Sequence, residues 1–207
     1  MSMDIDTINI NDIQIPILIT YYYDINKQLK TIYTLINYKE LNNDNINYCI
    51  KDLWLRFFYE LFLNITNIKD TKFIIFMHNL GSFDGGFLYK GLMLIDDIFH
   101  YKNISTIIDK QNQFIQITAK NKQFKFIWKD SYRIFNISLN EYCQTFDVQG
   151  KINPYKKEYN NISLFENQIL LDEFIQYAIQ DSIALLNAMK KAQNIYLQEY
   201  NIDIASK

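Results

Sequence analysis

One glycine-rich segment, placed directly after an apolar run, constrains the fold of this chain most. Residues 73–77 are apolar throughout, which predicts a buried β-strand. In the next ten residues, three of the chain's five glycines fall within six positions, so the backbone must bend or pack closely there. The same segment holds Asn79 and Asp84. A carboxylate at such a place is costly to bury unless something binds it, and a metal ion is one candidate.

The hydrophobic periodicity predicts an α/β or α+β domain built on a central mixed sheet, because strands come first, then strands alternate with helices, and a long helix closes the chain. A turn is expected at 24–27 and an irregular, polar stretch at 148–163. Strands are expected at 13–23, 30–37, 73–77, 105–108, 114–119 and 124–128, and helices at 48–65, 83–94, 138–146 and about 170–200.

Composition limits the class of protein. A length of 207 residues with 49% hydrophobic residues predicts one ordered domain with a sizeable core. The net charge of −2 argues against a broad nucleic-acid footprint, although a nuclease pocket lined by metal-binding carboxylates tolerates it. Cys49 and Cys143 lack metal-ligand spacing, so free thiols are expected. No signal peptide or membrane span is predicted.

The amino-acid bias of the chain indicates the base composition of its gene. The chain is rich in Ile, Asn, Lys and Tyr and poor in Ala, Gly, Pro and Arg. AT-rich codons produce this bias, which indicates an organellar, plasmid or AT-rich microbial gene. Among these origins we expect a mitochondrial location, for an organelle- or plasmid-encoded protein.

Three segments carry acids that can converge. Asp4 and Asp6 are two residues apart and share one face of a strand. Asp84 follows a second strand, and Tyr177 and Asp181 share one face of a helix because they are four residues apart. Converging carboxylates suit Mg²⁺ or Mn²⁺, and a pair of such ions activates water for phosphodiester cleavage.

In this order the segments resemble the three exonuclease motifs of family-B DNA polymerases, with Asp-x-Asp first, Asn-x-x-x-Phe-Asp second and Tyr-x-x-x-Asp third. Asp130 and Ser131, followed by Ser138, Leu139 and Tyr142, are similar to elements of the protein-primed subfamily of terminal-protein phages and mitochondrial linear plasmids. The resemblance extends from Asp4 to about Met189.

The resemblance implies a ribonuclease-H-like fold, a mixed β-sheet flanked by helices, of the 3′–5′ exonuclease type. It also implies a two-metal site for Mg²⁺ or Mn²⁺ and a water oriented by Tyr177. A lysine is expected to support the scissile phosphate; Lys151 is the first choice for this lysine and Lys156 the second. The implied metal ligands are Asp4, Asp6, Asp84 and Asp181, and the implied contacts to a single-stranded DNA 3′ end are Asn79, Phe83, Ser138, Leu139 and Tyr142.

Two features depart from the family pattern. Asp6 stands where the family has Glu, and a shorter carboxylate that shifts a metal by about 1 Å can cost ~100-fold in rate. Only three residues precede Asp4, where the family has a full apolar strand. No polymerase motif follows, so we expect residues 1–207 to form a single exonuclease-like domain without palm, fingers or thumb.

Three hypotheses stay open at this point. In the first, the chain is an active 3′–5′ exonuclease domain. In the second, it is a catalytically inactive remnant that lost its first strand and serves as a structural or nucleic-acid-binding subunit of a larger organellar protein or ribonucleoprotein complex. In the third, it is part of a longer polymerase. Simpler alternatives exist for single motifs. Asp4 and Asp6 could lie in a solvated tail, and Asp84 could be a helix N-cap.

Overall fold

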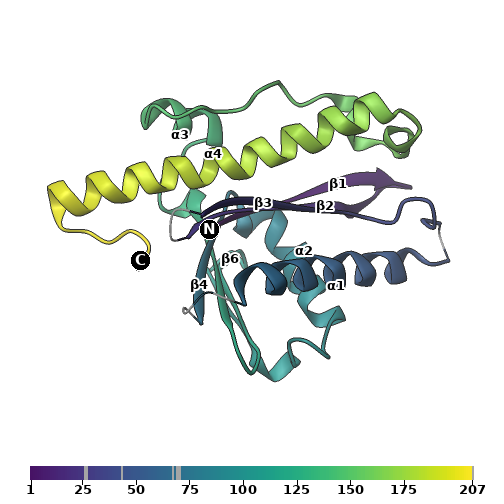
Figure 1. Cartoon of the computed structure of the whole chain (residues 1–207), viewed down its shortest axis with the longest axis horizontal. Helices are drawn as coiled ribbons and strands as arrows, with labels where there is room; N and C mark the ends of the chain where they lie inside the picture. The colour runs from purple at the N-terminus through teal and green to yellow at the C-terminus, as the bar shows by residue number, and fades with distance from the viewer. Residues whose placement is uncertain (26–27, 43, 67, 69–70, 207) are drawn as a thin grey trace.

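The computed structural model describes residues 1–25, 28–42, 44–66, 68 and 71–206. A seven-stranded mixed sheet in the order β3-β2-β1-β4-β7-β6-β5 forms the middle of the molecule (Figure 1). The strands are β1 (Ser2–Ile10), β2 (Ile13–Ile25), β3 (Gln28–Leu35), β4 (Lys72–Met77), β5 (Ile104–Ile108), β6 (Phe114–Lys120) and β7 (Lys125–Asp130).

Strand β1 lies inside the sheet. It pairs antiparallel with β2, and at its first residue, Ser2, it pairs parallel with Phe76 of β4. The register between β1 and β2 shifts after Asp6, because Asp6 pairs with Leu18 whereas Thr7 pairs with Pro16. One residue of β2 therefore bulges out of the ladder. The β1 residues up to Asp6 pair with β2 in one register, and the residues from Thr7 to the hairpin tip pair in another.

Helices cover both faces of the sheet, with α1 (Ile46–Ile65) and α2 (Gly85–Leu94) on one face and α4 (Gln168–Tyr200) across the other (Figure 1). The short helix α3 (Leu139–Thr145) packs beside α4. Helix α1 buries residues at helical spacing, among them Leu53, Phe57 and Leu61. Apolar burial on both faces makes the sheet rigid, and a rigid sheet fixes where each strand ends.

The predicted pattern of elements is confirmed for most of the chain. Every expected strand and helix is present within a few residues of its expected bounds, and the structure adds the N-terminal strand β1. The turn expected at 24–27 falls partly outside the described residues, and its first two residues continue β2. The helix expected at 83–94 is preceded by a π-helical turn over Leu80–Asp84 before α2 begins.

The sharp bend after β4 does not fall on a glycine. Asn79 takes the left-handed conformation, with φ 67° and ψ 30°, and no described glycine has a positive φ. The glycines instead allow close packing. A β-carbon on Gly85 would lie 2.5 Å from the Leu80 carbonyl oxygen and 2.6 Å from the Phe114 ring.

Two further expectations can be compared with the structure. Cys49 and Cys143 are free and buried. Within the part of the chain that the structure describes, no helix is both long and apolar enough to cross a membrane.

We predict that Gly91→Ala destabilises the protein by about 2 kcal/mol or more, because the new β-carbon would lie 2.1 Å from the buried Trp54 ring and force α2 away from α1. Gly86→Ala is the matched control in the same helix. It places a methyl group where no atom lies within 4 Å, so a gain of about 0.5–1 kcal/mol is expected from helix propensity. Urea unfolding of both variants measures the difference, and equal stabilities would contradict the prediction.

Candidate active site

One face of β1 points toward α4. The Ser2 hydroxyl donates to the Ser182 carbonyl oxygen at 2.6 Å, and the Thr20 hydroxyl lies 2.7 Å from the Ser182 hydroxyl. Because side chains alternate along a strand, Asp4 and Asp6 share this face with Ser2. These buried hydroxyl contacts fix the register of α4 on the sheet, and so they fix which helical residues face the acids.

The second segment is the π-helical turn Leu80–Asp84, which follows the C-terminal end of β4. Asp84 ends the π-helical turn and is 4% exposed. Asp84 occupies the N-cap position of α2, as the alternative expected, but it has helical backbone angles and its side chain makes no capping hydrogen bond. The turn therefore places this carboxylate inside the protein without using it as a structural cap.

The third segment is the middle of α4. Lys151, from the irregular stretch before it, donates from Nζ to Asp181 Oδ2 at 2.9 Å and to the Tyr177 hydroxyl oxygen at 2.7 Å. Lys156 is an exposed residue whose ammonium group pairs with Glu173 on the surface of α4. Of the two candidate lysines, only Lys151 lies at the acids.

These segments meet at one cavity of about 260 Å³. Asp4 and Asp6 contribute from β1, Asp84 from the turn after β4, and Asp181 from α4. The solvated-tail alternative for Asp4 and Asp6 is thus wrong, since both acids lie in β1. The other lining residues are Met3, Ile5, His78, Asn79, Phe83, Leu139, Lys151, Tyr155, Tyr177, Ser182 and Leu185.

Crowding of the carboxyl groups shifts their protonation. Burial, and then the charge of Asp181, raise the pKa of Asp4 to about 7, while Lys151 opposes the shift. Burial and the neighbouring acids raise the pKa of Asp6 and of Asp84 well above the usual range. Burial raises the pKa of Asp181 as well, although Lys151 lowers it. A metal-free site of this kind retains protons at neutral pH.

The other titratable groups at the cavity respond to the same surroundings. Burial, and then Asp181, raise the pKa of Tyr177 to about 12. Burial lowers the pKa of the Lys151 ammonium group, but the nearby charge of Asp181 and the hydrogen bonds to Tyr177 and Asp181 outweigh burial, so the pKa is raised overall. Burial, and then Lys151, lower the pKa of His78 to about 4, so this imidazole is neutral at physiological pH.

The donor set suits a hard divalent cation. Asp6 Oδ2 and Asp181 Oδ1 are buried without a hydrogen-bond partner, and both residues line the cavity. Among the described residues, no three His, Cys, Asp or Glu side chains stand close enough to form a ready ligand set. Mg²⁺ does not require one, because it is usually bound through one or two carboxylates and keeps water or phosphate oxygens as its other ligands.

The residues expected to contact nucleic acid separate into two groups. Asn79, Phe83 and Leu139 line the cavity, and Phe83 is 44% exposed at its edge. Ser138 and Tyr142 do not line it, and their contact with nucleic acid stays a prediction. Ser138 forms a capping box with Glu141 at the start of α3, and Tyr142 is 1% exposed and donates to the Met189 sulfur.

Two of the cavity residues that sequence reasoning missed carry aromatic rings with polar atoms. Tyr155 lies in the irregular segment before α4, and its ring centroid is 6.1 Å from that of Tyr177. No periodicity marks such a segment. His78 also lies at the cavity, with its Nδ1 3.0 Å from the Ser131 hydroxyl.

A mixed sheet with helices on both faces and acids from three segments defines the chain as a domain of the predicted ribonuclease-H-like fold class. No family model matches the chain. A curated "DNA polymerase" of Streptococcus phage Cp-1 is 26% identical over 152 residues, which cover 73% of this chain and 25% of that protein.

Solved structures show the same fold. Phi29 DNA polymerase in an orthorhombic crystal form matches 94% of this chain with a TM-score of 0.55 and 14% identity. Phi29 DNA polymerase complexed with single-stranded DNA matches 92% with a TM-score of 0.54 and 13% identity. The chain covers 31% of each of these proteins. It is therefore related in sequence to a phage DNA polymerase and shares the fold of part of a protein-primed family-B enzyme, as its motifs predicted.

We predict that the metal-free protein loses stability as the pH rises from about 4 to 7. The unfolded pKa of Asp4 is near 3.8 and the folded pKa is about 7, so the folded state binds the extra proton in this range. Asp84→Asn replaces a second raised acid with a neutral group. It should increase the free energy of unfolding at pH 8, because the folded state then no longer has to hold a buried acid whose pKa is raised.

Denaturant unfolding between pH 4.5 and 8.5 in the presence of a chelator measures both effects. Asp96→Asn removes an equal charge from an exposed turn and should leave the pH profile unchanged. A profile for Asp84→Asn that matches the wild type would contradict the assignment of Asp84 to the acid cluster.

Proposed function

We propose that this chain is a 3′–5′ exonuclease domain, related to the protein-primed family-B DNA polymerases, that hydrolyses phosphodiester bonds with two divalent metal ions. The chain spans about a quarter of the length of its curated relative and about a third of the solved chains, so polymerase activity is not part of the proposal. The expectations of a single domain over 1–207 and of a mitochondrial or plasmid origin remain part of the proposal.

One observation carries the proposal. Asp4, Asp6, Asp84 and Asp181 come from three distant segments and line the same cavity, together with Tyr177 and Lys151. Burying like charges costs free energy unless cations balance them. A fold stabilised by packing alone would gain nothing from this convergence, whereas phosphodiester hydrolysis requires it.

Each residue of the cavity has a chemical task in this scheme. The acids Asp4, Asp6, Asp84 and Asp181 would hold Mg²⁺ or Mn²⁺, and such ions activate water and stabilise the leaving oxygen when bound. Tyr177 accepts a hydrogen bond from Lys151, so its own O–H can orient the attacking water. The Lys151 ammonium group supplies a positive charge for the scissile phosphate at the rim of the acids.

The cavity edge suits the end of a single strand. The Phe83 ring is exposed there and contacts Phe87 edge-on with a centroid distance of 5.2 Å, which offers an apolar surface for a base. The Asn79 amide and the Leu139 side chain supply one polar and one apolar contact. Similarity to a polymerase solved with single-stranded DNA supports DNA as the substrate.

A second candidate function is supported by the Lys151 ion pair. Its ammonium group already neutralises Asp181, and the described residues hold no ready set of three ligands. A non-catalytic domain that binds nucleic acid within a larger assembly would retain such a neutralised site. Calorimetry distinguishes the two: a site that binds two Mn²⁺ ions per chain supports the exonuclease, and a site that binds none supports the inactive form.

We predict that the purified protein releases mononucleotides from the 3′ end of single-stranded DNA with Mg²⁺ or Mn²⁺. Asp84→Ala and Asp181→Ala should each lower the rate at least ~100-fold, because each removes a group that the charged transition state needs. Gel analysis of a 5′-labelled oligonucleotide measures the loss. If the wild-type chain degrades no single-stranded DNA with either metal, the active-enzyme proposal is wrong.

We also predict that the two candidate lysines differ. Lys151→Ala should lower the exonuclease rate by about 10²-fold, because the donor to Tyr177 and Asp181 is lost. Lys156→Ala removes an exposed ion pair with Glu173 and should change the rate less than about threefold. Equal effects of the two variants on single-turnover rates would contradict the role given to Lys151.

A further inference from the structure

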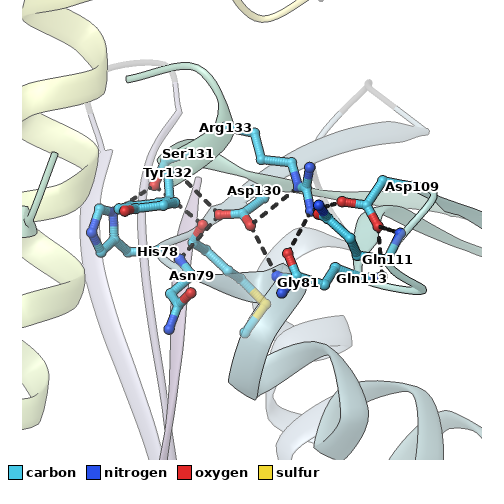
Figure 2. A network of polar contacts seen from close by, with 11 residues as sticks. His78, Asn79, Gly81, Asp109, Gln111, Gln113, Asp130, Ser131, Tyr132 and Arg133 are labelled. Atoms are coloured by element: carbon cyan, nitrogen blue, oxygen red, sulfur yellow. Dashed lines mark hydrogen bonds and ion pairs between the residues drawn. The ribbon is translucent and has the colours of Figure 1, made fainter. Parts of the chain in front are cut away.

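The Asp130 carboxylate collects backbone donors from two segments. It lies at the end of β7, where its residue pairs with Met77 at the end of β4, and it is 4% exposed. Oδ1 accepts from the amides of Asn79 and Tyr132 at 3.0 Å each, and Oδ2 accepts from the amide of Gly81 at 2.9 Å (Figure 2). One buried carboxylate thus binds the turn that follows a neighbouring strand.

The backbone of that turn needs an external support. Asn79 is in the left-handed conformation, which costs free energy for any residue with a β-carbon. A β-carbon on Gly81 would lie 2.9 Å from the Phe114 carbonyl oxygen and 3.1 Å from Asp130 Oδ2, so only glycine brings its amide this close. The hydrogen bonds to Asp130 therefore hold the residue whose side chain lines the cavity.

Asp130 is itself held from the far side. The Arg133 guanidinium group lies 3.9 Å from Asp130 Oδ2 and donates to Asp109 Oδ2 at 2.6 Å and to Gln113 Oε1 at 2.9 Å. Figure 2 shows these groups in one row, from His78 at one end to Asp109 in the turn between β5 and β6 at the other. The turn after β4 is thereby tied to a hairpin on the opposite side of Asp130.

We propose that Asp130 is a positioning residue for the bound strand: it fixes the Asn79 backbone so that the Asn79 amide meets the 3′-terminal nucleotide, and it acts on strand binding and not on bond cleavage. This inference rests on the proposed exonuclease function. Asp130 does not line the acid-lined cavity, and its carboxylate is occupied by backbone amides.

The test is Asp130→Asn, which keeps the shape of the side chain but places an NH₂ group opposite one of the backbone amides. We expect the KM for a single-stranded oligonucleotide to rise about tenfold, the loss typical of one disrupted hydrogen bond, while kcat changes less than about threefold. Hydrolysis of bis(p-nitrophenyl) phosphate, which has no nucleotide for Asn79 to contact, should be unchanged. An equal fall in activity on both substrates would overturn the proposal.

A double-mutant cycle isolates the route of the effect. If Asp130 acts through Asn79, then Asn79→Ala with Asp130→Asn raises KM no further than Asn79→Ala alone. Asp109→Asn is the matched control, because Asp109 belongs to the same network but makes no contact with the turn after β4. Additive effects of the first pair, or an Asp109→Asn effect as large as that of Asp130→Asn, would overturn the proposal.

Binding measured without catalysis separates this inference from the proposed function. Fluorescence anisotropy of a labelled single strand in a chelator should show about tenfold weaker binding for Asp130→Asn, even if the wild-type protein cleaves nothing. Unchanged binding would overturn the inference, whereas a lack of cleavage alone would overturn only the exonuclease proposal. Should Asp130→Asn fail to fold by circular dichroism, Arg133→Gln loosens the same carboxylate from a more exposed position and should weaken binding about threefold.

Discussion

Electrostatic repulsion among carboxylates that share one cavity is the constraint around which this structure is organised. Four acids face the same space; burial raises the pKa of each, and the charges of neighbouring acids raise the pKa of Asp4, Asp6 and Asp84 further. Such a cluster persists only when the surrounding scaffold is rigid enough to prevent the side chains from moving apart. The interior strand β1, the buried hydroxyl contacts to α4 and the apolar layers on both faces supply that rigidity.

One positive charge in the cavity partly offsets the repulsion among the carboxylates. Lys151 enters from a segment without regular structure and binds Asp181 and Tyr177. The ammonium group neutralises Asp181, and in the proposed exonuclease it would also meet the scissile phosphate.

The sequence predicted the elements and the convergence of acids well, because both depend on side-chain periodicity. The spacing of Leu53, Phe57 and Leu61 was enough to place α1, and the order of motifs was enough to associate Asp4 with Asp84 and Asp181. Features that depend on the backbone were not predicted. The bend fell on Asn79 and not on a glycine, and the hydrogen bonds to Asp130 involve amide groups that every residue shares. The packing of Tyr142 against Met189 of α4 was not predicted either, because a motif match does not show which neighbour a helical face contacts.

The bulge between β1 and β2 has a consequence for how this protein can diversify. The register shift after Asp6 divides the β1–β2 hairpin into two parts. One part contains Asp4 and Asp6, and the other contains the turn between Ile10 and Ile13. Residues gained or lost at the tip are absorbed before they reach the register of Asp4 and Asp6. Evolution, or an engineer grafting a new binding loop, can therefore rebuild the far end of this hairpin while the acids keep their geometry.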